Sequence, residues 1–326
     1  MRIVLRADGS PGIGLGHVMR SIALAQASLA AGLETILVVN QDPAVETALR
    51  RRELDYLTTG GTGARRWLDI VHPGDVVVYD GYHFGAPDHR AARDRGAVVA
   101  AVDDFGWGSF FVDLLVNTNP VDRTTYETLP ETRVLLGPEY ALIREGFAGR
   151  YRERDRSSGT LLVTLGGADV AAVSSRVLDV VAQSAVFERT LVVQGPAAED
   201  VGARPGLEVV VDPIDVAAIF DSADAAVATA GVTTWELLCL GVPTALIEVA
   251  ENQRHVIRAA TDLGAAIFVG TTAQIEERLG DAIDQLADPA IRRELTWRGR
   301  DLIDGRGAER VVGALEEAIK RRGDPR

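Results

Sequence analysis

The sequence predicts an α/β protein made of two similar halves, each built around a parallel β-sheet. Short apolar runs alternate with amphipathic helical segments along the chain, which is the pattern of βαβ units. Each half opens with an apolar strand and a glycine-rich turn, and a polar stretch at 150–159 separates the halves as an interdomain linker. A length of 326 residues also corresponds to about two domains. We therefore expect domains at 1–149 and 159–306, followed by a C-terminal helix at 307–326.

The elements of the first half follow from the spacing of its apolar residues. A buried strand at 3–7 leads into the loop DGSPGIGLGH at 8–17, and a helix follows over 17–31 until Gly32 ends it. The further candidate strands are 35–39, 75–79, 97–102 and 113–116, and the further candidate helices are 43–53 and 87–95.

The second half repeats the same order of elements. Its first strand is 160–165, and the turn GGAD at 166–169 leads into a helix. Further strands are expected at 190–194, 207–211, 225–228 and 243–248, and a helical stretch at 289–322. Ligands of doubly wound sheets bind at the carboxyl ends of the strands, so both glycine turns are expected to face a cleft between the halves.

The composition limits the classes of partner. A net charge of −13 argues against nucleic acid or an anionic membrane surface as the main partner. The hydrophobic share of 47% is typical of a globular protein, and no apolar stretch is long enough to cross a bilayer. Because Met1 leads straight into a strand, we expect no signal peptide and a cytoplasmic location.

The residue inventory excludes several kinds of chemistry. Lys320 is the sole lysine, which excludes a P-loop lysine and makes a Schiff-base lysine a poor hypothesis. Cys239 is the sole cysteine, so an intrachain disulfide and a cysteine-rich zinc site are excluded. The histidines form no H-E-x-x-H pair, and no G-x-S-x-G elbow is present. We expect an enzyme that uses neither a metal ion nor an organic cofactor.

The loop before the first helix is the strongest candidate for a catalytic site. It is not the dinucleotide fingerprint, because the third glycine of G-x-G-x-x-G would fall at His17. Gly14 and Gly16 let backbone N–H groups at the helix start converge on an anion such as a diphosphate. A histidine in such a crevice is a candidate general base. The alternative is that His17 is an ordinary helix residue whose polar groups bond to the backbone.

A second candidate site lies in the segment ATAGVTTWELL at 228–238. A strand ends here in a turn of small residues, and the N–H groups of a new helix would form an anion cradle with Gly231, Val232, Thr233 and Thr234. Glu236, one turn into the helix, could accept two hydrogen bonds from vicinal ribose hydroxyls. Helix capping by Thr233 and Glu236 is the competing interpretation.

Other polar residues follow the ends of predicted strands. Gly166 and Gly167 form the glycine turn after the strand at 160–165 and are further candidates for binding the diphosphate. Asn252 and Gln253 follow the strand at 243–248 and offer amide groups to sugar hydroxyls or a phosphate, although they could equally be cap residues.

Two carboxylates follow neighbouring strands of the first half. Asp80, with Tyr82 close behind, follows the strand at 75–79, and Asp104 follows the strand at 97–102. Either carboxylate could orient His17 or bind a sugar hydroxyl. Adjacent aspartates after a strand are also ordinary turn residues.

Taken together, these segments resemble the PseG-like family, the UDP-sugar hydrolases of pseudaminic acid biosynthesis, within the wider MurG-like glycosyltransferase B (GT-B) group. The matching blocks run through most of the chain and are specific as a set: RAD at 6–8 with GLGHVMR at 14–20, VDDF at 102–105, DLLVN at 113–117, LGPEYALIR at 136–144, LGGAD at 165–169, TWEL at 234–237 and NQ at 252–253.

The resemblance implies a GT-B fold, with two Rossmann-like domains facing a nucleotide-sugar cleft and a C-terminal helix that crosses back to the first domain. It implies that His17 activates a water molecule, which attacks the anomeric carbon and displaces UDP with inversion. The segment from Gly231 to Glu236 would hold the diphosphate and ribose. Asn252 would lie near the phosphates or the sugar, and Asp8 is a further candidate for binding or orienting the sugar.

Two alternatives to the hydrolase remain open. A glycosyltransferase would use the same base, with a hydroxyl of a small-molecule or glycan acceptor in place of water. A non-catalytic nucleotide-sugar binding protein is the other alternative, and the presence of His17 beside the glycine loop argues against it.

Overall fold

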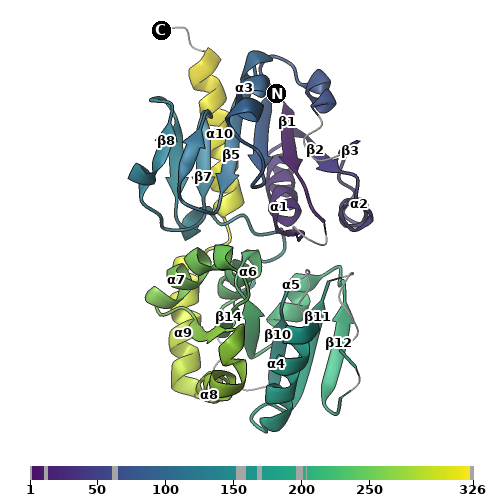
Figure 1. Ribbon diagram of the computed structural model, residues 1–326, viewed down its shortest axis with the longest axis vertical. Coiled ribbons are helices and arrows are strands. Elements are labelled where there is room, and N and C mark those ends of the chain that lie inside the picture. The colour runs from purple at the N-terminus through teal and green to yellow at the C-terminus, as the bar shows by residue number, and fades with distance from the viewer. Residues whose placement is uncertain are drawn as a thin grey trace. The chain divides into compact units, whose positions relative to one another are not determined.

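The computed structural model describes residues 2–10, 14–60, 65–151, 159–166, 171–195, 201–202 and 204–323 (Figure 1). Contacts divide the chain into two compact units. The first unit combines Met1–Glu145 with Arg306–Arg326, and the second is Gly146–Gly305. Each unit is built on a parallel sheet with helices on its faces, which confirms the predicted α/β class.

The sheet of the first unit is parallel throughout, and its described strands run in the order β3-β2-β1-β4-β5-β7-β9. The central strands β1, β4 and β5 are buried and mostly apolar, apart from Arg2 and Arg6 in β1 and the aspartate that ends β4 and β5. Mostly apolar strands are expected where helices cover both faces of a sheet. The bounds are Arg2–Ala7 for β1, Glu34–Asn40 for β2, Tyr56–Thr59 for β3, Val76–Asp80 for β4, Val98–Asp103 for β5, Leu114–Asn117 for β7 and Arg133–Leu136 for β9. A separate small ladder pairs β6 (Gly108–Phe110) with β8 (Tyr126–Thr128).

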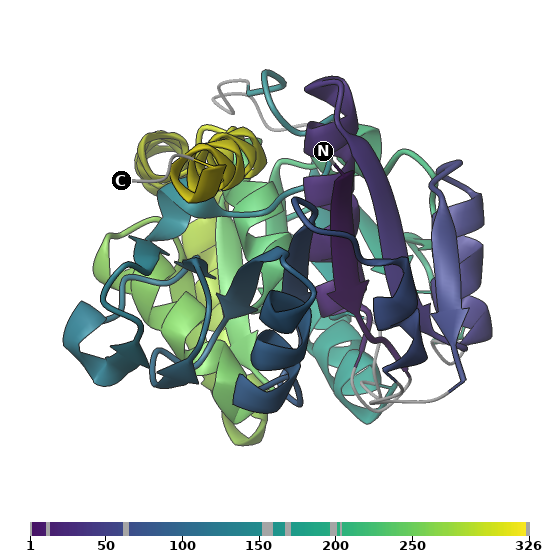
Figure 2. The same cartoon turned by 90° about the horizontal axis from the view of Figure 1, so that it is seen from above.

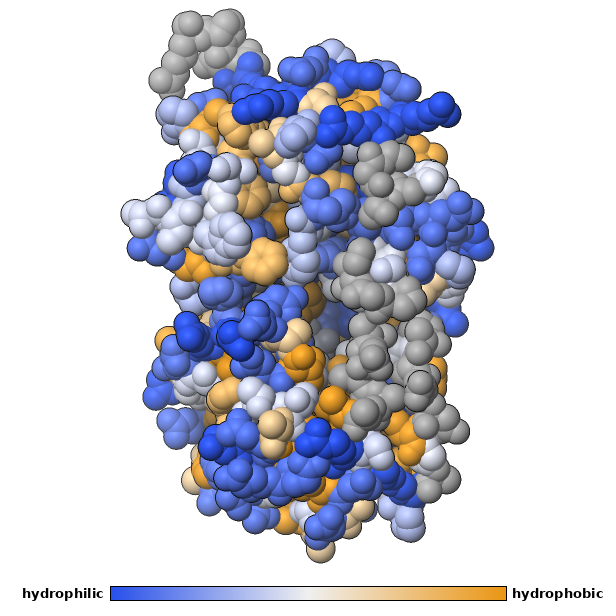
Figure 3. All heavy atoms as spheres, viewed as in Figure 1, coloured by the Kyte–Doolittle hydropathy of each residue, from blue (hydrophilic) through white to orange (hydrophobic). Residues whose placement is uncertain are grey.

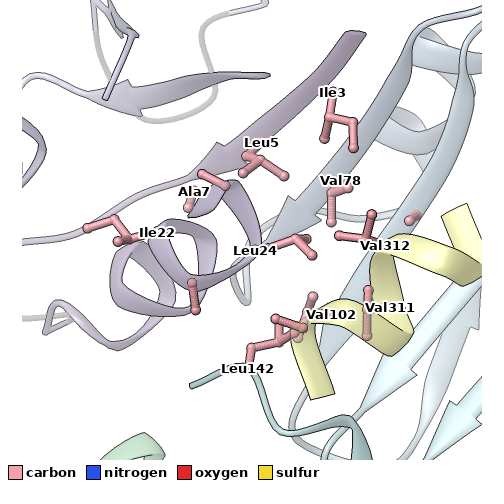
Figure 4. Packing of buried hydrophobic residues seen from close by; sticks show 14 of the residues in the cluster. Ile3, Leu5, Ala7, Ile22, Leu24, Val78, Val102, Leu142, Val311 and Val312 are labelled. Carbon is pink, nitrogen blue, oxygen red and sulfur yellow. The ribbon is translucent and has the colours of Figure 1, made fainter. Parts of the chain in front are cut away.

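Helices cover this sheet on both faces, as the view from above shows (Figure 2). Three helices pack on side chains of β1 and β4 on one face: α1 (Gly16–Ala30), α2 (Pro43–Arg50) and α10 (Gly307–Gly323). In the core cluster on this face, Val311 and Val312 of α10 lie with Leu24 of α1 and Val78 of β4 (Figure 4). The other face is covered by α3 (Ala86–Asp94). The short 3₁₀ turns are η1 (Arg66–Ile70), η2 (Arg123–Thr125) and η3 (Pro138–Tyr140).

The second unit has a parallel sheet whose described strands run in the order β12-β11-β10-β13-β14-β15. Its apolar core lies between this sheet and helices α4, α8 and α9. The strands are β10 (Thr160–Thr164), β11 (Arg189–Gln194), β12 (Leu207–Val211), β13 (Ala225–Thr229), β14 (Thr244–Glu248) and β15 (Ile267–Thr271). The helices are α4 (Ala171–Gln183), α5 (Val216–Asp221), α6 (Val232–Cys239), α7 (Arg254–Asp262), α8 (Ile275–Ala287) and α9 (Pro289–Leu302), with 3₁₀ turns η4 (Glu251–Gln253) and η5 (Thr272–Gln274).

The helical stretch expected over 289–322 consists of two helices, α9 and α10. Helix α9 ends at Leu302, because Ile303 is already extended with φ −130° and ψ 108°. Between the two helices Gly305 adopts a left-handed conformation with φ +84°, and a Cβ at this position would lie 2.9 Å from Ala148 Cα. The expected linker falls mostly at 152–158, outside the described residues.

The surface is largely hydrophilic on the face drawn in Figure 3, with apolar side chains scattered over both units. Among the residues that the structure describes, no helix combines the length and apolar character needed to cross a bilayer.

Candidate functional site

The loop after β1 is fixed by backbone and side-chain hydrogen bonds. Asn40, at the end of β2, accepts from the Gly9 N–H through Oδ1 (2.9 Å) and donates to the Gly9 carbonyl through Nδ2 (2.8 Å). Gly14 has φ +80°, a left-handed conformation that favours glycine, and its N–H donates to the Ser10 carbonyl over 2.7 Å. Helix α1 then begins at Gly16, directly after this turn. These contacts determine where His17, the second residue of α1, is placed.

His17 forms a buried pair with Asp80, at the carboxyl end of β4. Its Nδ1 lies 2.7 Å from Asp80 Oδ1, and the two residues are only 5% and 2% exposed. If Nδ1 carries the proton and donates it to the carboxylate, Nε2 keeps its lone pair and can accept a proton from a substrate. A carboxylate that fixes the tautomer and orientation of a histidine in this way is the arrangement of a general base.

Arg20 determines which tautomer of His17 is consistent with the hydrogen bonds. One turn after His17, its guanidinium holds Asp80 from Nε (3.0 Å) and Nη2 (2.7 Å), and it holds Asp104 from Nη1 and Nη2 (3.0 Å). The two hydrogens of Nη2 are thus used by the two carboxylates, although His17 Nδ1 lies 2.9 Å from the same nitrogen. Nδ1 of His17 therefore donates to Asp80 rather than accepting from Arg20.

Asp104 completes this cluster from the carboxyl end of β5. Burial opposes its ionisation, but the charge and hydrogen bonds of Arg20, the nearby His17 and the Tyr82 hydroxyl together hold the pKa of the Asp104 carboxyl below its ordinary value. The Tyr82 hydroxyl donates to Asp104 Oδ2 over 3.0 Å, and the Tyr82 ring stands edge-on to His17 with centroids 4.5 Å apart. The structure thus brings together four of the residues expected from the sequence: His17, Asp80, Tyr82 and Asp104.

The cluster is arranged to accept a proton. With His17 neutral, two carboxylates face one guanidinium, so the formal charge of the cluster is −1. Uptake of a proton by His17 brings that charge to zero. An imidazolium at His17 would thereby be compensated within a buried setting, where electrostatic interactions are strong.

Asp8 occupies a separate ion pair in the same unit. Both of its carboxylate oxygens accept from the guanidinium of the fully buried Arg6, and His83 Nε2 lies 2.8 Å from Asp8 Oδ2. Asp8 itself is almost completely buried. These contacts give Asp8 a role in holding the ends of β1 and β4 together, whereas the sequence suggested contact with the sugar.

In the second unit, the expected diphosphate residues gather at the carboxyl ends of neighbouring strands. Gly166, with φ +86°, follows β10, and a Cβ there would lie 3.6 Å from Thr229 Oγ1 at the end of β13. Gly231 caps helix α6, and a Cβ at Gly231 would meet nothing within 4 Å. Val232 and Thr233 are half-buried in the first turn. Gly167 lies outside the described residues.

Two residues of this segment, Thr234 and Glu236, are buried. The Thr234 hydroxyl accepts from the Gly231 N–H over 3.2 Å, so this side chain caps the start of α6. Glu236 is 1% exposed. The capping role that the sequence suggested for Thr233 and Glu236 belongs instead to Thr234, because it is the third residue of the helix and its side chain reaches back to the N-cap.

Asn252 and Gln253 lie in η4, directly after β14, the strand next to β13. Gln253 Oε1 accepts from the Val249 N–H over 3.0 Å, which closes the turn after β14. Asn252 is half-buried beside it.

Sequence reasoning missed Arg20 and His83 as parts of these clusters. Arg20 could have been found, because a residue three positions after His17 on a helix shares its face. His83 carried no comparable signal, since its partner Asp8 follows a different strand, far away in the sequence. In the described part of the chain, no three or more His, Cys, Asp or Glu side chains are grouped so that they could hold a metal ion.

Comparisons with known proteins agree with this fold. No family model matches the chain. The spore coat polysaccharide biosynthesis protein SpsG of Bacillus subtilis (strain 168) is 25% identical over 340 residues, covering 97% of this chain and 98% of that protein. MurG of Acinetobacter baumannii superposes with a TM-score of 0.64 at 17% identity, over 97% of this chain and 99% of that one.

A second solved structure, CalG4, the calicheamicin glycosyltransferase, gives a TM-score of 0.65 at 15% identity, over 99% of this chain and 100% of that one. The chain therefore has the GT-B glycosyltransferase fold, as the sequence predicted.

Proposed function

We propose that this protein is a nucleotide-sugar-dependent inverting glycosyltransferase in which His17 is the general base. The observation that carries the proposal is the buried His17–Asp80–Arg20 arrangement at the carboxyl ends of β1 and β4 of a GT-B fold. In this mechanism Nε2 of His17 takes the proton of an acceptor hydroxyl. The resulting oxygen nucleophile attacks the anomeric carbon, and the nucleoside diphosphate leaves with the electrons of the broken bond.

The second unit supplies the proposed site for the leaving group. Gly231, Val232 and Thr233 begin helix α6, where backbone N–H groups and the helix dipole favour a diphosphate without a metal ion. We propose UDP as the nucleotide, with Glu236 at the ribose, from the resemblance of the TWEL block. A cytoplasmic location remains a prediction from the sequence.

Transfer is favoured over hydrolysis because the similar proteins whose names describe an activity build or transfer glycans. The hydrolase remains the second candidate, since the GLGHVMR and VDDF blocks resemble the PseG-like family. The two activities share the base and differ in the nucleophile, so one experiment separates them.

Release of nucleoside diphosphate from UDP- and dTDP-sugars tests the proposal. Each donor, including UDP-2,4-diacetamido-2,4,6-trideoxy-β-L-altrose, is incubated without an acceptor and then with a panel of hydroxyl acceptors, and proton NMR follows the products. Transfer predicts release that rises strongly with one acceptor and gives a glycoside. Fast release of free sugar without an acceptor would instead establish the hydrolase.

The variant His17→Ala assigns the base. General-base catalysis contributes about 10²–10⁴-fold, so we expect turnover to fall by that factor while nucleotide binding persists. His72→Ala is the matched control, because His72 is exposed and precedes β4 at the opposite, amino edge of the sheet. Undiminished turnover by His17→Ala would refute the assigned role.

A further inference from the structure

A row of aromatic rings runs outward from His17 in the first unit. The centroids of Tyr82 and Phe105 are 4.7 Å apart and those of Phe105 and Trp107 are 6.3 Å apart, while Tyr82 itself stands 4.5 Å from His17. Tyr82 is 47% exposed and Trp107 is 67% exposed. Adjoining exposed rings beside a cluster of convergent polar groups are typical of ligand-binding surfaces.

The turn that carries this row is held by several bonds. The Asp103 carboxylate accepts from the Gly106 N–H and from the Tyr126 hydroxyl, each over 2.7 Å. Gly106 has φ +78°, and a Cβ there would lie 2.7 Å from Val121 Cγ1, so the turn also requires glycine. Phe105 and Trp107 flank this residue directly. Their rings are therefore presented on a rigid support, which lowers the entropic cost of binding a ligand.

The charges beside the row select against anions. Asp80 and Asp104 accept hydrogen bonds from the single guanidinium of Arg20, which gives the cluster a formal charge of −1 with His17 neutral. The Asp103 carboxylate, bonded to the Gly106 N–H in the turn that carries the rings, adds a further negative charge. A carboxylate or phosphate on the ligand would be repelled here. An uncharged ring with hydroxyl groups suits this surface, because its C–H face can stack on the aromatic rings and its hydroxyls can donate hydrogen bonds to Asp104.

We propose that the aromatic row, Tyr82, Phe105 and Trp107, binds an uncharged pyranose ring of the acceptor and presents one of its hydroxyls to His17. This inference rests on the proposed function and names its acceptor class: a neutral sugar, bound by stacking. Phe105 and Trp107 are specificity-determining residues in this scheme, and neither was singled out from the sequence.

The first test is kinetic and uses the full chain. Trp107→Ala should raise the KM for an uncharged acceptor by about 10-fold, the effect expected when one stacking ring is lost, without a matching change in the KM for the donor. Trp107→Phe should restore most of the lost affinity. Trp297→Ala is the control, since Trp297 is 58% exposed on α9 of the second unit and should leave both constants unchanged.

The second test measures binding directly and stays informative if no donor is turned over. Tryptophan fluorescence is titrated with a panel of methyl hexopyranosides and with the matching methyl glucuronide. The aromatic row is supported if at least one neutral glycoside quenches the fluorescence saturably, binds at least 10-fold more tightly than the glucuronide, and gives no quenching in Trp107→Ala. Quenching that survives Trp107→Ala, or no quenching by any neutral glycoside, overturns it. If transfer depends on His17 but neither the acceptor KM nor the quenching depends on Trp107, this inference is refuted and the proposed function is not.

Discussion

Replacing His89 with phenylalanine should make the first unit less sensitive to acid. His89 lies in α3 and is 1% exposed, packed 5.4 Å from the ring of Tyr79 and stacked 5.9 Å from Phe110. Neither of its ring nitrogens has a hydrogen-bond partner among the described residues. Burial lowers the pKa of His89 from 6.5 to about 4, against a smaller opposing effect of the Asp88 charge.

The sign and size of the effect follow from proton linkage. The unfolded chain takes up a proton near pH 6.5, whereas folded His89 takes it up only near pH 4, so stability is fully present above pH 6.5 and is lost as the pH falls toward 4. At 1.36 kcal/mol per pKa unit, the loss is about 2 kcal/mol at pH 5 and about 3 kcal/mol at pH 4 and below. Phenylalanine has a similar shape and no proton to bind.

Urea unfolding at pH 7 and pH 5 measures this difference. Other groups also titrate, so the informative quantity is how much more stability the natural protein loses than His89→Phe over the same pH step. We expect about 2 kcal/mol. His72→Gln is the control, because that histidine is exposed and its replacement should leave the pH step unchanged. Equal losses for the natural protein and His89→Phe would refute the reasoning.

Three further predictions concern the site and its supports. Asp80→Asn should lower kcat by about 10² or more with little change in KM, because an amide cannot fix His17 as a carboxylate does, and steady-state kinetics on the folded variant would check it. Gly106→Ala should lower the free energy of unfolding by about 2 kcal/mol or more, since it combines a left-handed conformation with a close contact to Val121, and urea titration measures this. Cys239, whose pKa burial raises to about 12, should resist iodoacetamide at pH 8 in the folded protein and react fully in denaturant.

The fold class could be predicted from the sequence because its strongest signals are local. The core strands β4 and β5 are apolar runs that each end in one aspartate, and β1 is apolar apart from Arg2 and Arg6. A buried parallel strand leaves such a run in the sequence whatever its neighbours are. The edge strand β3 was not found, since YLTT is short, polar and half-exposed. Strand β15 was missed as well, because Gly270 interrupts it where its pairing with β14 shifts register.

Only the positions of the candidate site residues could be predicted from the sequence, and not their contacts. His17, Asp80 and Asp104 each follow a strand or open a helix, so their place at the carboxyl edge of the sheet could be expected. Their bonding could not, because which carboxylate meets His17 depends on the order of strands in space. The same order makes Arg20 the link between two carboxylates that lie 60 and 84 positions further along the chain.

The membership of α10 in the first unit has a consequence for synthesis on the ribosome. Val311, Val312 and Leu315 complete the apolar core over β1, β4 and β5, yet they are made only after all of Gly146–Gly305. At about 5–20 residues per second that interval is roughly 10–30 s. During it, the part of the sheet face that α10 covers stays exposed beside α1 and α2, while the second unit can already fold as a continuous stretch. The nascent first unit is therefore where a chaperone that binds exposed apolar surface would be expected to act.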